Sequence, residues 1–399
     1  MPEKIKISAI ICELNPFHSG HAALFSHAKS LSQGLVCVLS GNFVQRGEPA
    51  ILDKWARTRL ALSQGADLVI ELPLPWACAG AERFAAGGIA LLKGLGNVDT
   101  LLFGSEEPEM ESLWALAEAL LSPEFSKELQ KQDDGLSFPQ RREKAVSRLL
   151  GTATAALLQK PNCILGVEYL KAILQQKASM TASLFPRLGA GHDTPDESGP
   201  ILSASHARAL LLEGADLSDR LPESTWQVWN DESAIGRCPV SLSRLEVGVL
   251  CKLRSMTVEE FSQLPDISEG LEYRLYKAAR QAGSLEEFYS LVKSKRYSHA
   301  RIRRLAMAAF LGLTKDLPQL PPYLRILGMT PTGEQILRQA SPALPIAARP
   351  GDFQRLDKAA QSLFAIECRA DDLYALGLPC PTPCGRDFTE KLIKVNRET

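Results

Sequence analysis

A short stretch near the N-terminus, residues 5–29, constrains the fold more than any other part of the sequence. The apolar run 5–11 predicts a buried strand, and a tight loop then leads into a helix. His18 and His21 lie three residues apart at the start of that helix, so their side chains face the same way. The free N–H groups and the dipole of a helix start attract anions, and Gly20 lets a phosphate approach the backbone closely. The stretch therefore predicts a cradle for the phosphates of a nucleotide.

Further apolar runs alternate with helical segments as far as about residue 122. The expected strands occupy residues 35–39, 67–72 and 100–103. Continuous apolar strands separated by helices indicate a parallel sheet that is covered on both faces, and such sheets bind ligands at the carboxyl ends of their strands. We therefore expect three loops to line one crevice, although each alone is compatible with an ordinary connector. They comprise residues 18–21, 41–46 and 104–106.

A second candidate phosphate site follows farther along the chain. Residues 113–176 have a helical pattern, with Asn162 placed to cap a helix start. Ser203 and Ser205 open another helix, and Arg208 lies one turn farther on. Serine hydroxyls at a helix start can hydrogen-bond phosphate, and Arg208 can reach back to the same anion. The alternative is a capped surface helix with an arginine that binds nothing.

Beyond residue 215 helical periodicity dominates and strands are hard to identify, which predicts a helical domain appended to the sheet. Its outstanding feature is the acid-free run 293–304, with Tyr297 among its cations. The cations are Lys293, Lys295, Arg296, Arg301, Arg303 and Arg304. Because the whole chain has a net charge of only −1, RNA binding must come from such a local patch. The alternative is a solvated helix face.

Length and composition exclude several classes of protein. A chain of 399 residues is long enough for two or three domains, and 45% hydrophobic with 23% charged residues is typical of a globular protein. The sequence has no apolar run of about 20 residues and begins with a segment that leads directly into a strand, so we expect neither a membrane span nor a signal peptide. These features indicate a cytoplasmic protein and leave its oligomeric state open.

Nine cysteines in such a chain favour a reducing compartment. Five of them lie among apolar residues and are expected to be small buried side chains. These are Cys12, Cys37, Cys78, Cys163 and Cys251. Cys380 and Cys384 form the one pair with close spacing, but prolines lie between them and a fourth ligand is missing beside Cys368, so no metal site is expected.

Two motifs resemble the signatures of a known superfamily. The His18-Ser19-Gly20-His21 motif resembles the HxGH signature of nucleotidylyl transferases and class I aminoacyl-tRNA synthetases, and the segment 203–208 resembles their second, serine-rich signature. Eight longer words also occur in order between residues 5 and 304 and resemble the bacterial tRNA(Met) cytidine acetate ligase family. They are ELNPFHSGH, SGNFVQRGEPAILDKWAR, GADLVIELP, FGSE, PNCILGVEYL, FPRLGAGHD, SASHAR and KSKRYSHARIRR.

This resemblance implies an α/β fold, with a Rossmann-like nucleotidylyl transferase domain built on a parallel sheet and a mainly α-helical C-terminal domain. We expect the ATP-binding domain to span 1–214 and the helical, tRNA-binding domain to span 215–399. The resemblance implies a ligase that uses ATP to activate acetate as acetyl-adenylate, with Mg²⁺ sharing the charge. The acetyl group would then pass to N4 of the wobble cytidine of elongator tRNA(Met), giving N4-acetylcytidine.

The resemblance also implies which residues act. His18, His21 and Arg208 would stabilise the leaving pyrophosphate, an electrostatic role that requires no covalent nucleophile. The implied contacts to ATP, to which we add the two serines of the second motif, are Ile7, Ser8, Ala9, Ile10, Ile11, Cys12, Glu13, Leu14, Asn15, Pro16, Phe17, His18, Ser19, Gly20, Gly104, Asn162, Arg187, Ser203 and Ser205. The six cations of the run 293–304 would contact tRNA.

Two other functions remain compatible with these motifs. A small-molecule adenylyltransferase shares both signatures but has no need of a basic helical domain of this size. A non-catalytic RNA-binding protein could use the same fold, but it would not need the intact residues His18, Gly20, His21, Ser203 and Arg208. A tRNA titration distinguishes the first alternative, and pyrophosphate release from ATP with acetate would exclude the second.

Overall fold

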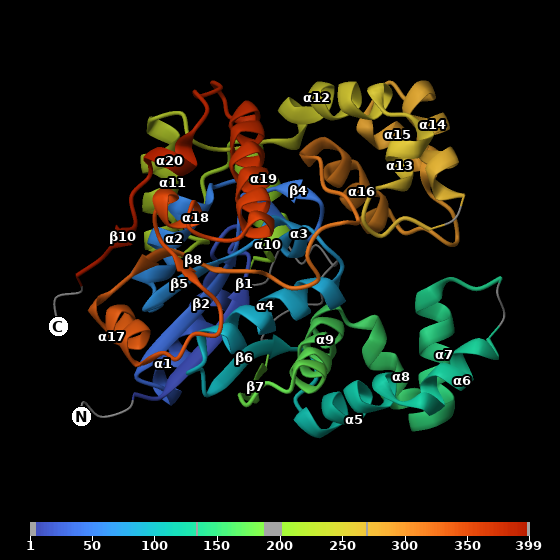
Figure 1. Ribbon diagram of the computed structural model, residues 1–399, viewed down its shortest axis with the longest axis horizontal. Helices are drawn as coiled ribbons and strands as arrows, with labels where there is room; N and C mark the ends of the chain where they lie inside the picture. The colour runs from blue at the N-terminus through green and yellow to red at the C-terminus, as the bar shows by residue number, and fades with distance from the viewer. Residues whose placement is uncertain (1–4, 133–134, 187–201, 269, 397–399) are drawn as a thin grey trace.

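A central, mostly parallel sheet organises the molecule (Figure 1). The computed structural model describes residues 5–132, 135–186, 202–268 and 270–396. The strand order of the sheet is β10-β8-β5-β2-β1-β6-β7, and β9 pairs with β8. The five strands of its N-terminal part are β1 (Ile7–Cys12), β2 (Gly34–Ser40), β5 (Leu68–Leu72), β6 (Thr100–Ser105) and β7 (Thr181–Pro186).

The winding of the sheet reverses at β1. This strand pairs in parallel with β2 on one side, in the register Ile7↔Gly34 to Cys12↔Leu39, and with β6 on the other side. Every residue of β1 and β2 is buried, because helices cover both faces of the sheet. An open sheet of this kind binds ligands outside the carboxyl ends of its strands at the point of reversal. The loop that follows Cys12 is therefore the expected place for a ligand.

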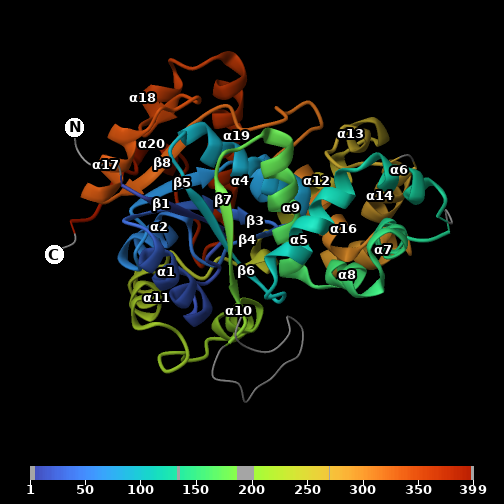
Figure 2. The ribbon, with the colours of Figure 1, turned by 90° about the horizontal axis from the view of Figure 1, so that it is seen from below.

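Successive residues of each strand point to opposite faces of the sheet and pack into two separate cores. Ile10 and Cys37 pack with helices α1 (Ser19–Leu31), α2 (Lys54–Ser63), α10 (Ala204–Leu212) and α11 (Glu223–Ala234). Ile11 and Val38 pack on the opposite face with α4 (Ala81–Leu95) and α9 (Pro161–Gln176). Figure 2 shows α1, α2 and α11 together on one side of the strands. The mixed α/β fold with a mostly parallel sheet is therefore confirmed.

Two groups of helices extend beyond the sheet (Figure 1). The first precedes α9 and comprises α5 (Met110–Leu121), α6 (Pro123–Gln130), α7 (Phe138–Leu150), α8 (Thr152–Ala156) and the 3-10 turn η1 (Leu157–Gln159). The second has a core of its own and comprises α12 (Leu242–Ser255), α13 (Val258–Ser262), α14 (Leu271–Gln281), α15 (Leu285–Val292) and α16 (His299–Leu311). The mainly helical character of the C-terminal half is confirmed as well.

The last part of the chain nevertheless returns to the sheet, which the sequence did not indicate. Strand β8 (Leu324–Met329) pairs antiparallel with β5, and β9 (Ile346–Ala347) and β10 (Ile393–Lys394) pair with β8. The intervening elements are α17 (Pro331–Gln339), α18 (Pro350–Phe353), α19 (Lys358–Tyr374), the 3-10 turn η2 (Ala375–Gly377) and α20 (Arg386–Thr389). A domain division after residue 214 stays a prediction, because residues 324–394 add strands to the N-terminal sheet.

A small antiparallel hairpin and a short helix complete the element list. The hairpin follows β2 and consists of β3 (Phe43–Val44) and β4 (Glu48–Pro49), while α3 (Leu74–Ala77) precedes α4. Among the described residues, no helix is long and apolar enough to cross a membrane. The expectation that Cys251 is buried is wrong, because its side chain lies on the exposed face of α12.

Candidate nucleotide site

The two histidines of the HxGH motif form a reciprocal cap at the start of α1. His18 is the N-cap residue, and its Nδ1 accepts a hydrogen bond from the backbone N–H of Gly20 at 3.0 Å. The Nδ1 of His21 in turn accepts from the backbone N–H of His18 at 3.3 Å. The centroids of the two imidazoles lie 3.9 Å apart, with the rings tilted by 33°. The spacing of the motif thus stacks both rings at the helix end that follows β1.

This cap also fixes the hydrogen-bonding capacity of the two rings. An Nδ1 atom that accepts a hydrogen bond carries no proton, so a neutral imidazole in this position carries its proton on Nε2. His18 is only 7% exposed, and the hydrogen bond from the N–H of Gly20 to its Nδ1 orients the ring. The two side chains can therefore present N–H donors to an anion at the positive end of α1.

Arg208 connects the serine-rich helix start to the loop after β1. Its Nη1 donates to the backbone oxygen of Asn15 at 2.8 Å, and its Nη2 lies 3.0 Å from Oε1 of Glu48 in β4. Burial lowers the pKa of Arg208, and the carboxylate of Glu48 acts in the opposite direction. Ser203 caps α10 by accepting from the N–H of His206, and its hydroxyl lies 3.4 Å from that of Ser205. The two phosphate motifs are therefore neighbours in the fold.

A carboxyl group lies between the first and second loops. Oε1 of Glu13 accepts a hydrogen bond from the backbone N–H of Gln45 at 2.7 Å. Burial raises the pKa of Glu13, whereas the Gln45 hydrogen bond and the charge of Arg208 act to lower it. The loop after β2 consequently closes over the loop after β1, as the strand-end argument predicts.

Arg57 is a structural residue of this site that the sequence did not reveal. It lies in α2 with its side chain fully buried, and burial lowers the pKa of its guanidinium. The guanidinium donates to backbone oxygens at the ends of β1 and β2 and in the loop before α2, which fixes these loops relative to each other. The acceptors are the oxygens of Leu52, Glu13, Ser40 and Gly41. An arginine in a helical pattern is ordinarily a surface residue, so only its tertiary contacts identify it.

The third loop holds Asn162 close to the end of β6. Oε1 of Glu106, two residues after Gly104, accepts from Nδ2 of Asn162 at 2.5 Å, and Oε2 accepts from the N–H of Cys163 at 3.0 Å. The expectation that Asn162 caps its helix is wrong, because α9 begins at Pro161 and the glutamate satisfies its free N–H groups instead. Asn162 thus lies beside the third loop, although it is distant from it in sequence.

We expect Asn162→Ala to raise the pKa of Glu106. Burial alone acts to raise the pKa of this carboxyl, but hydrogen bonds from Asn162 and from backbone amides outweigh it and hold the pKa below its ordinary value. A carboxyl group whose pKa is lowered by folding stabilises the fold at pH values above its pKa in the unfolded chain. This contribution is lost as the pH falls through the folded pKa. An NMR titration of the Glu106 carboxyl measures the shift, with Asn97→Ala as the control. An unchanged pKa in the variant would contradict this account.

One of the residues implied for ATP, Arg187, lies outside the described residues. The last described residue of β7, Pro186, pairs with Ser105 at the end of β6. Gly104 itself pairs with Phe185 in the same register. The carboxyl ends of β6 and β7 therefore stand side by side next to the loop that carries Glu106.

The basic run 293–304 divides into two sets. Lys293, Lys295 and Arg296 have exposed side chains in the turn before α16. The other three cations contact the protein itself. Arg301 donates to the backbone oxygen of Asp266 at 2.6 Å, Arg303 lies 5.6 Å from the ring centroid of Tyr289, and burial lowers the pKa of Arg304. The described contacts of the first set involve its backbone and not its side chains, and its binding to tRNA stays a prediction.

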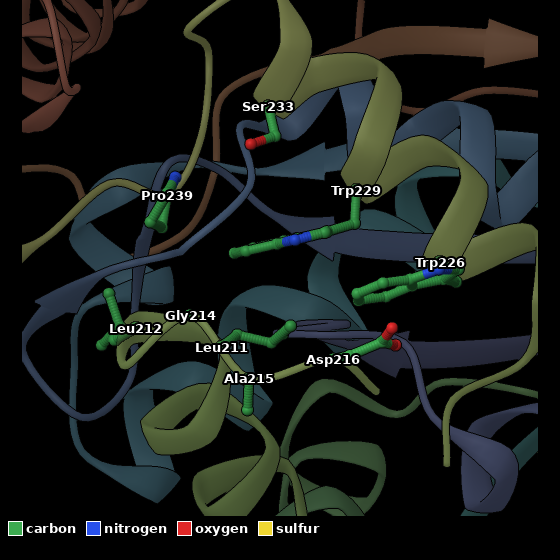
Figure 3. Close-up of a pocket in the computed structure, with 9 residues that line it drawn as sticks. All are labelled: Leu211, Leu212, Gly214, Ala215, Asp216, Trp226, Trp229, Ser233 and Pro239. Atoms are coloured by element: carbon green, nitrogen blue, oxygen red, sulfur yellow. The ribbon is translucent and has the colours of Figure 1, made fainter. Parts of the chain in front are cut away.

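A cavity of about 370 Å³ lies at the far end of α10 from Ser203 (Figure 3). Figure 3 shows the indoles of Trp226 and Trp229 projecting from α11 toward Leu211 and Asp216. Its lining residues include none of those that form the loops after β1, β2 or β6. This cavity is therefore separate from the place where the HxGH motif and Arg208 meet.

A parallel sheet whose first strand leads into an HxGH helix start defines the class of HIGH nucleotidyl transferases. The family model described as HIGH Nucleotidyl Transferase matches residues 5–386. Two relatives with the name tRNA(Met) cytidine acetate ligase are each 37% identical, one from Acetivibrio thermocellus and one from Syntrophomonas wolfei. The matches cover 98% and 96% of this chain, and 100% and 98% of the relatives. The chain therefore belongs to the tRNA(Met) cytidine acetate ligase family of HIGH nucleotidyl transferases.

Solved structures of Thermotoga maritima TmcAL have the same fold. The apo structure matches with a TM-score of 0.93 at 32% sequence identity, over 98% of this chain and 100% of that one. A second structure, in which that protein is bound with alpha-thio ATP, matches with a TM-score of 0.90 over the same shares of the two chains. The likeness covers the sheet and the C-terminal helices alike.

Proposed function

We propose that this protein is an ATP-dependent ligase that activates acetate as acetyl-adenylate and transfers the acetyl group to N4 of the wobble cytidine of elongator tRNA(Met). The observation that carries the proposal is the stacked pair His18 and His21 at the start of α1, at the reversal point of the sheet, with Arg208 bonded to the same loop. Membership of the ligase family and the likeness to a protein solved with an ATP analogue support it. The proposal places the protein in the cytoplasm.

The first half-reaction suits the electrostatics of this site. An acetate oxygen attacks the α-phosphorus of ATP, the bond from that phosphorus to the bridging oxygen breaks, and pyrophosphate leaves with its electron pair. Negative charge grows on the leaving group, and the Nε2 donors of His18 and His21 together with the guanidinium of Arg208 can stabilise it. Acetate is a weak nucleophile, so the site must also hold it in line with the leaving group. Gly104, Asn162, Ser203 and Ser205 would complete the ATP contacts.

Mg²⁺ would share this role by neutralising charge on the phosphates. Among the residues that the structure describes, no group of three or more His, Cys, Asp or Glu side chains could hold a metal ion. Mg²⁺ usually keeps several waters and is bound by one or two carboxylates plus substrate phosphates. The residues present are compatible with an ion that arrives with ATP, and Glu13 is the carboxyl group of the first loop that could bind it.

In the second half-reaction, the N4 amine attacks the acetyl carbonyl, a proton leaves the nitrogen and AMP departs. The tRNA would be held through its phosphates by the exposed cations Lys293, Lys295 and Arg296. Incubation of the protein with ATP, acetate and total tRNA, followed by nucleoside mass spectrometry, tests the whole proposal. We expect N4-acetylcytidine that depends on all three components. Pyrophosphate release with no modified nucleoside would favour a small-molecule adenylyltransferase instead.

We expect the triple variant Lys293→Gln, Lys295→Gln, Arg296→Gln to bind tRNA more weakly. Each lost phosphate contact should flatten the salt dependence of binding by about 0.7–0.9 in the log–log slope. Release of pyrophosphate without tRNA should hardly change, because these side chains lie outside the nucleotide loops, and acetylation should fall mainly through a higher KM.

The matched control replaces three exposed cations near α18, α19 and β10, namely Arg355, Lys358 and Lys391, by glutamine. Binding titrations at two salt concentrations compare the two triple variants. Equal tRNA binding by both variants would mean that the basic turn is a solvated surface that does not bind tRNA.

A further inference from the structure

The β3–β4 hairpin lies within the word SGNFVQRGEPAILDKWAR, and the proposed chemistry gives its residues no role. It pairs Val44 with Glu48 and Phe43 with Pro49, and it follows β2 at the ligand-binding edge of the sheet. The N–H of Gln45 at its turn bonds to Glu13 in the loop after β1. The hairpin is thus part of the wall of the candidate nucleotide site.

Glu48 is one of two described partners that fix the position of the Arg208 guanidinium. Its Oε1 lies 3.0 Å from Nη2, and the backbone oxygen of Asn15 accepts from Nη1 at 2.8 Å. The side chain of Arg208 is only 13% exposed and that of Glu48 is 23% exposed. A guanidinium has five N–H donors in a rigid fork, so two anchored donors leave others to face an anion in a fixed direction.

The charges around Arg208 give Glu48 a second role. Arg46 lies in the turn of the same hairpin, and its positive charge lowers the pKa of Arg208, as burial does. The charge of Glu48 makes the largest contribution that raises the pKa of Arg208, and the charge of Glu13 raises it as well. Without Glu48, Arg208 would be repelled by Arg46 while it remained partly removed from water. The carboxylate therefore holds the guanidinium in place through its charge as well as through geometry.

The hairpin packs against helices α16 and α19. Gly47 has φ +74°, and a Cβ atom at this position would lie 2.7 Å from the backbone nitrogen of Arg304 in α16. Phe43 belongs to the core of the C-terminal helices. Its ring meets that of Tyr374 edge to face, with 5.9 Å between the ring centroids. A glycine is required because the hairpin turn packs against the backbone of α16. Glu48 is consequently presented to Arg208 by a rigid element.

We propose that Glu48 is a positioning residue of the ligase, which holds Arg208 in the orientation that receives the triphosphate of ATP and the departing pyrophosphate. This inference rests on the function proposed above. Glu48 acts only through Arg208, so its effect should disappear when the guanidinium is absent. This dependence separates a positioning role from a general contribution to stability.

A double-mutant cycle tests the proposal on the full-length protein. The rate of acetate-dependent pyrophosphate release is measured for the parent, Glu48→Ala, Arg208→Ala and the double variant. We expect Glu48→Ala to slow release about tenfold in the parent background, in line with couplings between contacting charged groups, and less than twofold in the Arg208→Ala background. Glu48→Gln should recover only part of the rate, because the amide keeps the size of the side chain but lacks the charge that attracts the guanidinium. Equal losses in both backgrounds would overturn the proposal.

Two further measurements keep the outcome decisive. Glu334→Gln, which removes a half-buried carboxylate that pairs with Lys394 outside the nucleotide loops, controls for loss of negative charge and should release pyrophosphate at the parental rate. If the parent released no pyrophosphate with acetate, the proposed function would fail, and the same cycle would then be measured on the dissociation constant of ATP by calorimetry. Coupling in ATP affinity would support the positioning role, and additive losses would refute it.

Discussion

We expect His21→Ala to slow acetate-dependent release of pyrophosphate by about 10²–10³-fold, because it removes a preorganised donor at a developing charge. The Nδ1 of His21 is tied to the backbone of His18, and the rings are stacked at 3.9 Å, so the imidazole is already placed before ATP arrives. The same change removes one half of a helix cap, which costs about 1 kcal/mol and leaves the fold intact.

Steady-state assays of pyrophosphate release without tRNA measure this effect, and thermal unfolding checks that the variant is folded. His299→Ala is the matched control, because it removes a histidine from the first turn of another helix, α16, outside the nucleotide loops. A His21→Ala enzyme that worked at a near-parental rate would remove the histidine pair from the chemistry. It would leave Arg208 and the start of α1 as the groups that stabilise pyrophosphate.

The sheet could be predicted from the sequence because its strands are local, continuous apolar runs. The expected run 35–39 became β2 (Gly34–Ser40), which pairs with β1 in parallel, as the alternation of strands with helices predicts. Strand β8 was missed for the opposite reason. It joins β5 across more than two hundred residues and runs antiparallel to it, and no local pattern encodes that pairing.

In the candidate site too, features set by local sequence spacing could be predicted, and features set by tertiary contacts could not. The three-residue spacing of His18 and His21 determines their shared face, so their geometry was accessible from sequence. The roles of Arg57 and Glu48 depend on tertiary contacts with other loops, so charge and periodicity alone could not assign them. Asn162 was misplaced as a cap because Glu106 supplies the acceptor from a separate loop.

The basic run shows why charge counting overestimates a binding surface. Six cations in twelve residues indicate RNA binding, but a sequence does not say which cations already have partners. Arg301 bonds to Asp266, and Arg304 lies against the hairpin turn at Gly47. Packing therefore divides the run into a turn that can contact tRNA and a helix that packs against the hairpin through Arg304.

A buried network of charges joins the returning C-terminal segment to the sheet. Nζ of Lys54, at the start of α2, lies 3.1 Å from Glu71 in β5, 2.7 Å from Asp371 in α19 and 2.8 Å from Asp387 in α20. Its side chain has no exposed surface. Arg325 in β8 pairs with the same glutamate at 3.0 Å. One ammonium group thus compensates carboxylates from three elements that are distant in sequence.

We expect Lys54→Met to lower the free energy of unfolding by about 3–5 kcal/mol, the usual cost of leaving buried charges without their partner. Lys29→Met is the matched control. Lys29 pairs with the buried Asp67 at 2.9 Å but is 31% exposed, and Asp67 keeps hydrogen bonds from the N–H of Leu35 and the hydroxyl of Thr330, so the loss of Lys29 should cost less than the loss of Lys54. Denaturant unfolding of both variants at neutral pH measures the two costs. A Lys54→Met protein as stable as the Lys29→Met protein would mean that Arg325 alone balances the network.

The pH dependence of the Lys54→Met deficit should identify its cause. Burial raises the pKa of Asp371, and the charge of Lys54 opposes that rise, so removing the lysine raises the pKa of Asp371 further. A carboxyl group whose folded pKa lies above its unfolded value stabilises the fold at low pH and loses that contribution as the pH rises through the folded pKa. The deficit of the variant should therefore be largest at high pH and should shrink as the pH is lowered through the raised pKa of Asp371. A deficit that is constant with pH would point to lost packing of the lysine side chain instead of uncompensated charge.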